Sequence, residues 1–196
     1  MKRFLAILLT TLGLSFSLSA QEHNRRPPAP APPRPTPTPT KAPSAIEDDS
    51  GWVNFKSPLG RFSVLVPETP QDKTETTQSE HGPYTTHLFV VRDPKNVYLI
   101  GWVDYDPSFN FNRQAELEAN RDNFVKGISA TLVATRATTI DGYPAIEFTA
   151  ETSDRTFKSR VYMVGRRPYQ IVVGYPKDDP DAEATSRFFN SFKVQP

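Results

Sequence analysis

Proline is the residue that most limits what the first quarter of this chain can form. Nine of the 20 prolines fall in the 25 residues from 21 to 45. Each proline fixes φ and removes a backbone donor, so a helix or a central strand cannot persist through this density. Polyproline II rises by about 3.1 Å per residue, which gives the stretch from Pro27 to Pro43 a reach of roughly 50 Å. The sequence therefore predicts a disordered proline-rich tether over residues 21–50, ahead of a folded domain.

The tether follows a segment with the anatomy of a secretory signal peptide. Lys2 and Arg3 precede an apolar run over residues 4–18, and two small residues come next. The run is shorter than the roughly 20 apolar residues of a membrane-spanning helix, and it matches the apolar centre of an export signal. We predict a signal peptide over residues 1–20 and a protein exported to the periplasm or the extracellular space. Retention of the segment as an anchor stays open, and membrane association is expected only in that case.

Composition excludes several classes of function. The chain carries 23 Lys and Arg against 22 Asp and Glu, so it lacks the basic surplus with which a nucleic-acid-binding domain neutralises phosphates. It has no cysteine, which excludes disulfides, thiolate metal ligands and a cysteine nucleophile. It has 3 histidines and neither a glycine-flanked nucleophilic serine nor a phosphate-binding glycine loop. The sequence therefore predicts no metal site, no cofactor and no catalytic centre.

Residues 51–196 are predicted to be one folded domain made mostly of strands. Turn-forming residues at short intervals separate runs of β-branched and aromatic residues. Residues 61–66 alternate between apolar and polar, which is typical of a strand with one buried face. Residues 97–105 and 169–175 are apolar on both faces, which indicates central strands covered on both sides.

A hairpin is expected to turn at residues 153–154. It would place Glu147 opposite Arg160 and Thr149 opposite Lys158. Cross-strand pairs of this kind contribute about 0.2–1 kcal/mol each, so these charged side chains have a structural role available to them.

Two helices are expected among the strands. The first would be capped by Asn110 or Asn112 and would end at Gly127, and the second would begin near Asp179 to Asp181. Each repeats apolar residues at helical spacing. These residues are Leu117, Phe124, Val125 and Ile128 in the first helix, and Thr185, Phe188, Phe189 and Phe192 at the second. Strand follows strand too often for a doubly wound parallel fold, so the pattern predicts an α+β domain with an antiparallel sheet packed by helices.

Three stretches of this domain carry a resemblance to a known family. They are residues 52–67 (WVNFKSPLGRFSVLVP), 141–148 (DGYPAIEF) and 187–194 (RFFNSFKV). With them the chain resembles the exported bacterial domains of the PsbP-like fold over essentially all of residues 51–196. The family is named for an extrinsic lumenal subunit that helps to retain ions at the photosynthetic oxygen-evolving complex, and most bacterial members have no assigned activity. The resemblance implies an α/β/α sandwich around an antiparallel sheet and a non-catalytic role in assembly or binding.

The polar residues most suggestive of chemistry are Asp104 and Asp106, which close the apolar stretch at 97–105. Two carboxylates on one face of a strand would suit general acid–base catalysis or a hard cation. Alternatively, each would bond local backbone amides where the strand turns into the first helix. Both interpretations remain open from the sequence.

Four further residues complete the candidate binding set. Phe109 and Phe111 would either cover the sheet or form an exposed contact patch. Arg166 and Arg167 would either grip an anion with paired guanidiniums or form a charged hairpin turn.

Three functions fit the sequence, and the first is preferred. It is an exported, non-catalytic interaction or assembly module held on a proline-rich spacer, whose partner is another envelope or extracellular protein. The second is a carrier that binds a small molecule or an ion between sheet and helix. The third is a hydrolase that uses Asp104 and Asp106.

Overall fold

A computed structural model describes residues 44–47, 51–79, 82–110 and 112–195. The predicted signal peptide and most of the predicted tether lie outside these residues, as does Phe111. The elements in chain order are β1 (Ser44–Glu47), β2 (Val53–Ser57), β3 (Phe62–Val66), β4 (Gln71–Asp72), β5 (Glu75–Ser79), β6 (Gly82–Arg92), β7 (Val97–Tyr105), α1 (Arg113–Gly127), β8 (Thr131–Ile140), β9 (Tyr143–Glu151), β10 (Arg155–Val164), β11 (Arg167–Pro176), α2 (Ala182–Ser191) and β12 (Lys193–Val194).

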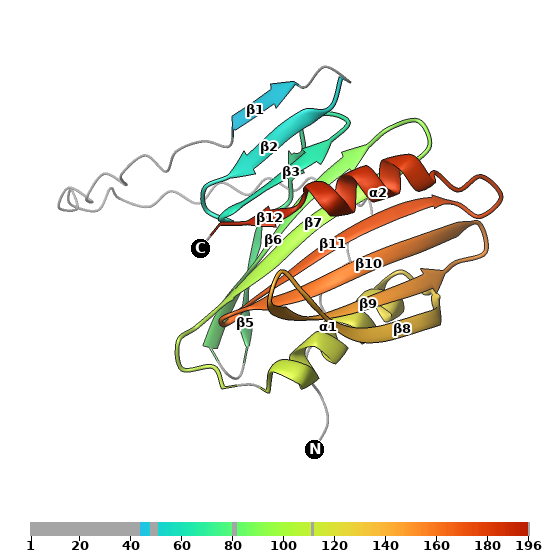
Figure 1. The fold of residues 1–196 in the computed structure, drawn as a ribbon. Helices are drawn as coiled ribbons and strands as arrows, with labels where there is room; N and C mark the ends of the chain where they lie inside the picture. Colours follow the sequence, from blue (N-terminus) through green and yellow to red (C-terminus); the bar gives the residue numbers. More distant parts are fainter. Residues whose placement is uncertain (1–43, 48–50, 80–81, 111, 196) are drawn as a thin grey trace, which may run out of the picture.

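The strands form two antiparallel sheets (Figure 1). The larger has eight strands in the order β4-β6-β7-β11-β10-β9-β8, with β5 pairing beside β6, and the smaller has the order β1-β2-β3-β12. This confirms the predicted α+β class with antiparallel pairing. The second sheet was not predicted, because β2 and β3 give no sequence signal that separates them from the larger sheet.

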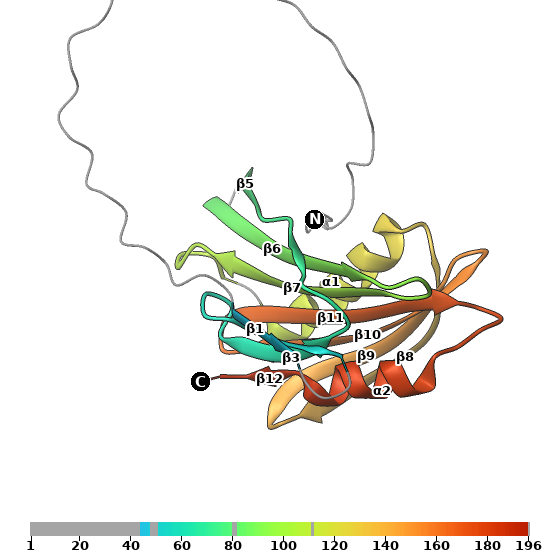
Figure 2. The same ribbon diagram turned by 90° about the horizontal axis from the view of Figure 1, so that it is seen from above.

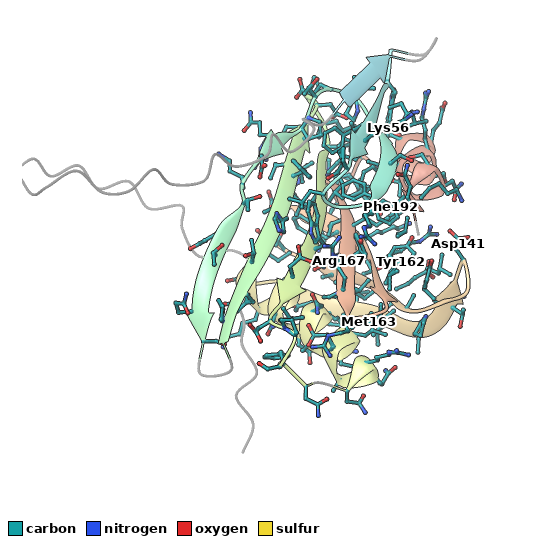
Figure 3. The ribbon with its side chains drawn as sticks, turned by 90° about the vertical axis from the view of Figure 1, so that its left-hand side faces the viewer. Lys56, Asp141, Tyr162, Met163, Arg167 and Phe192 are labelled. Atoms are coloured by element: carbon teal, nitrogen blue, oxygen red, sulfur yellow. The ribbon has the colours of Figure 1, made fainter. Side chains whose placement is uncertain are left out.

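The two helices cover opposite faces of the larger sheet. Figure 2 shows α1 on one side, and α2 together with the small sheet on the other. Neighbouring residues of β10 illustrate the division: Tyr162 packs in the core under the small sheet and α2, whereas Met163 packs in the core under α1 (Figure 3). Because both faces are covered, β7 and β11 are buried along most of their length, as their sequences predicted.

The helix caps follow from the sequence with one refinement. Of the two asparagines proposed for the first cap, Asn112 is the one used, and its side chain accepts hydrogen bonds from the backbone of Gln114 and Ala115. Gly127 is the last residue of α1 as predicted, but the left-handed conformation falls on Ser129, which has φ 53°. Asp181 caps α2 through a hydrogen bond from the backbone of Ala184.

The structure tests the predicted register of one hairpin and the predicted start of the folded domain. The hairpin between β9 and β10 has the expected register, with Glu147 opposite Arg160 and Thr149 opposite Lys158. In contrast, Ser44–Glu47 lies within the predicted tether and yet pairs as β1 with β2. The sheet therefore begins earlier than residue 51. None of the described helices is long and apolar enough to cross a membrane.

Candidate functional site

Asp104, near the end of β7, is the centre of a polar cluster on one face of the larger sheet. Its Oδ1 accepts hydrogen bonds from Arg167, with Nε at 2.7 Å and Nη2 at 2.6 Å. Its Oδ2 accepts a hydrogen bond from Trp102 Nε1 at 3.2 Å and lies 3.3 Å from His87 Nε2. The register explains the meeting, because His87 of β6 and Tyr169 of β11 both lie opposite Trp102, and residues two apart on a strand share a face.

The cluster is built around the Trp102 indole. The His87 ring stacks on it with centroids 4.3 Å apart and planes inclined by 7°. Arg167, labelled in Figure 3, also reaches the turn between β2 and β3, where its Nη1 donates to the Leu59 carbonyl at 3.0 Å. Tyr169 donates from its hydroxyl to the Gly60 carbonyl at 2.8 Å. The side chains around Asp104 therefore tie the larger sheet to the small one.

Asp106 and Arg166 have local partners instead. Asp106 Oδ1 accepts hydrogen bonds from the backbone and the hydroxyl of Ser108, at 2.9 and 2.6 Å, and these bonds hold the pKa of the Asp106 carboxyl below its ordinary value. Arg166 donates to the carbonyls of Asp106, Pro107 and Phe109. Asp104 and Asp106 share none of these partners, and Arg166 and Arg167 bind different groups.

Phe109 lies half-buried against β7. Its ring stacks on Tyr105, with centroids 4.6 Å apart and planes inclined by 10°. Tyr105 in turn donates its hydroxyl hydrogen to Glu116 of α1. The stack therefore connects the loop after β7 to α1, which is the sheet-covering alternative proposed for this residue.

His87 lies close to Asp104 and Thr74, and its hydrogen bonds depend on its protonation. Thr74 donates its hydroxyl hydrogen to Asp72 Oδ1 at 2.6 Å and lies 3.3 Å from His87 Nδ1. A neutral ring has one N–H and can donate either to Thr74 from Nδ1 or to Asp104 from Nε2, whereas the imidazolium can donate to both. The hydroxyl proton points to Asp72 and away from the ring, unlike the proton of a nucleophile in a Ser-His-Asp triad.

Burial of the ring, assisted by the positive charge of Arg167, lowers the pKa of His87 below its ordinary 6.5, against the raising effects of Asp104 and Asp72. The unfolded chain therefore takes up a proton at higher pH than the folded chain does. We expect the stability contributed by this site to be fully present above about pH 6.5 and to decline as the pH falls below that value. Thermal unfolding measured from pH 7.5 to pH 5 should show this decline, and His87→Gln should reduce it. An unchanged pH dependence in that variant would contradict the assignment, since the other histidines are common to both proteins.

No group of three or more His, Asp or Glu side chains in the described part of the chain could hold a metal ion.

A groove of about 370 Å³ lies elsewhere on the larger sheet, between α2 and strands β8 to β10. None of the six residues proposed from the sequence lines it. The site was missed because its polar residues come from four elements, and only the pairings of Glu147 with Arg160 and of Thr149 with Lys158 were visible as a pattern.

The comparisons with known proteins concern the fold. No family model matches this chain, and no curated protein matches its sequence. The structure is similar to the solution structure of cyanobacterial PsbP (CyanoP) from Synechocystis sp. PCC 6803, with 10% identity and a TM-score of 0.47, over 81% of this chain and 96% of that one. A crystal structure from Bacteroides thetaiotaomicron is similar over 69% of this chain and 46% of that one, with 14% identity and a TM-score of 0.30. The comparison of structures thus returns the PsbP-like resemblance that the sequence motifs predicted.

Proposed function

We propose that this protein is an exported, non-catalytic interaction or assembly module, a layered α/β/α domain held on a proline-rich spacer. Its partner is another protein of the envelope or the extracellular space, which adds an extended segment to the edge strand β8. The single observation that supports this most is the open outer edge of β8. Export is supported by the signal-peptide anatomy of residues 1–20.

Strand β8 is the last strand of the larger sheet, and nothing in the described chain pairs with its outer edge. It is ten residues long, and most of its side chains are exposed. Leu132 and Val133 are 36% and 57% exposed, and with Leu59 they are the exposed large apolar side chains of the described residues. A long, open and apolar edge strand presents unpaired backbone donors and acceptors to an added strand.

The charge of β8 favours a different protein over a second copy as its occupant. Arg136 is the only charged residue of the strand, and its side chain is 72% exposed. A symmetric antiparallel pairing of two β8 strands over most of their length would bring two Arg136 side chains together, and like charges on facing strands destabilise a sheet. A partner segment with an acidic side chain at this position would pair favourably.

The contacts of the two aspartates support the non-catalytic part of the proposal. Asp104 is bound by Arg167 and Trp102, and Asp106 by Ser108, so each carboxylate is already used within the fold. A hydrolase would need one of them to hold or release a proton beside a substrate.

Site-specific photo-crosslinking of the full-length protein in its native envelope tests the proposal. A crosslinking residue at Val133 should give one discrete adduct with a different protein, and the same residue at exposed Leu59 should not. Leu132→Lys should abolish the adduct, because a charge on the edge opposes strand addition. Mass spectrometry of the same sample should place the mature N-terminus at Gln21.

Three results would overturn the proposal. They are no adduct at Val133, the same adducts from Val133 and Leu59, and an adduct that contains only two copies of the bait.

A further inference from the structure

The groove beside α2 includes side chains of β8, among them Arg136, but it does not require pairing at the backbone edge of that strand, and it shares no residue with the cluster around Asp104. In Figure 1, α2 lies over the sheet alongside β11, and strands β10, β9 and β8 follow on the side away from the small sheet. These strands form the floor of the groove, and α2 forms one wall with Thr185, Ser186, Phe189 and Asn190. Its volume of about 370 Å³ falls in the range of small-molecule sites, roughly 300–1,000 Å³.

The floor carries a row of paired charged side chains and, beside it, one further cation. In the row, Arg136 of β8 lies opposite Glu147 of β9, and Glu147 lies opposite Arg160 of β10. Lys158 lies two residues from Arg160 on the same strand, opposite Thr149, and therefore shares its face of the sheet. The pairing of three strands thus gathers three cationic side chains on the face under α2.

One carboxylate is shared between two of these cations. Glu147 bonds Arg136 through one oxygen and Arg160 Nε through the other, at 2.7 Å. Burial alone would raise the pKa of Glu147, but the two arginines hold it below its ordinary value, so this carboxyl is charged at neutral pH. Lys158 is exposed and has no ion-pair partner among the described residues. The floor therefore carries three positive charges and one negative charge.

The arginine nearest α2 is held in place. The Arg160 guanidinium lies 4.7 Å from the centre of the Phe189 ring, and it also bonds Glu147. Arg136 is bound on one side only and remains 72% exposed. A ligand in the groove would therefore meet one fixed guanidinium and two cations with free hydrogen-bond donors, which suits a ligand with several acceptor oxygens.

Thr185 supplies an independent sign that a polar ligand belongs here. This residue of α2 lines the groove and is only 7% exposed. Its Oγ1 is buried and has no hydrogen-bond partner within the described chain. A buried hydroxyl without a partner is unfavourable, and a ligand oxygen in the groove would satisfy it.

We propose that this groove binds a small dianion rich in acceptor oxygens, either a dicarboxylate or a phosphate group. Lys158, Arg136 and Arg160 supply the charge that balances the ligand, and Thr185 supplies a neutral hydrogen bond. Two negative charges match the surplus of two positive charges on the floor. The inference goes beyond the proposed protein partner, because it requires nothing to bind the edge of β8.

Isothermal titration of the full-length protein at low ionic strength tests this inference, with succinate and inorganic phosphate as separate probes and glucose as the neutral control. We expect saturable binding of at least one anion and none of glucose. Lys158→Gln should weaken that binding about tenfold, the effect of losing one charge-assisted hydrogen bond. Lys56→Gln is the matched control, because Lys56 is an exposed strand lysine of the small sheet, far from the groove in the chain and labelled in Figure 3.

Thr185→Val distinguishes a ligand site from a general attraction of anions to a basic surface. The variant keeps the shape of the side chain and removes the unpartnered hydroxyl. It should weaken binding about fivefold, the effect of a neutral hydrogen bond, without lowering the melting temperature of the free protein. The inference is overturned if neither anion binds saturably, or if Lys158→Gln and Thr185→Val both bind as tightly as the Lys56→Gln control.

Discussion

Replacing Phe62 with alanine should lower the free energy of unfolding by about 3–5 kcal/mol, the cost of deleting a buried aromatic ring. Phe62 is fully buried. Its ring contacts other aromatic rings on both sheets and beside α2, with centroids 5.4 to 6.4 Å away. These rings belong to Phe55, Phe89, Trp102, Tyr169 and Phe192. Because they come from separate elements, they cannot close together over the cavity without moving the small sheet.

Chemical denaturation of the wild type and Phe62→Ala would give this difference. Leu59→Ala is the matched control, because Leu59 lies three residues away in the turn before β3 and is 51% exposed. Its effect should stay within about 0.5 kcal/mol. A loss below about 1 kcal/mol for Phe62→Ala would mean that the two sheets do not depend on this ring.

Replacing Phe124 with alanine should cost a similar amount, about 3–5 kcal/mol, on the opposite face of the sheet. Phe124 and Leu117 are the buried residues of α1. The Phe124 ring packs against Phe148 of β9 and Phe157 of β10, with centroids 5.8 and 5.9 Å away. Few other apolar side chains hold α1 to the sheet, so the loss of this ring should loosen the helix as a unit.

Amide hydrogen exchange distinguishes this effect from a general loss of stability. Phe124→Ala should reduce protection across Arg113–Gly127 more than across β7 and β11. Lys126→Ala, an exposed substitution two residues away on the same helix, should leave protection nearly unchanged. If Phe124→Ala lowered protection equally throughout the sheet, α1 would not be a separately held element.

Local sequence patterns predicted the elements whose apolar residues repeat at a regular spacing or whose turn residues are adjacent in the chain. Residues 97–105 are apolar on both faces and form β7 with the same bounds. The spacing of Thr185, Phe188 and Phe189 predicted the buried face of α2. The turn at 153–154 fixed the register of β9 and β10, because a hairpin's pairing is set by its turn.

The polar sites depend on strand neighbours that are distant in sequence, and no local pattern encodes those neighbours. Asp104 and Asp106 looked like a pair because they are two residues apart, yet Asp104 is bound by Arg167, 63 residues away. The groove shows the same difficulty. Glu147 and Arg160 were paired correctly, but no local pattern indicated that Arg136 would complete the row or that α2 would place Thr185 beside it.

The small sheet also constrains the order of events during folding. Its strand β12 pairs with β3, so that Val194 lies opposite Phe62, and the Ser191 hydroxyl accepts a hydrogen bond from the Leu65 backbone 126 residues earlier. Such distant contacts form late, because a long loop must close before they contribute. During synthesis β3 stays without this neighbour until nearly the whole domain has left the ribosome. A chain that crosses a membrane unfolded, which is one route for the proposed export, would benefit from this delay, because it would remain unfolded for longer.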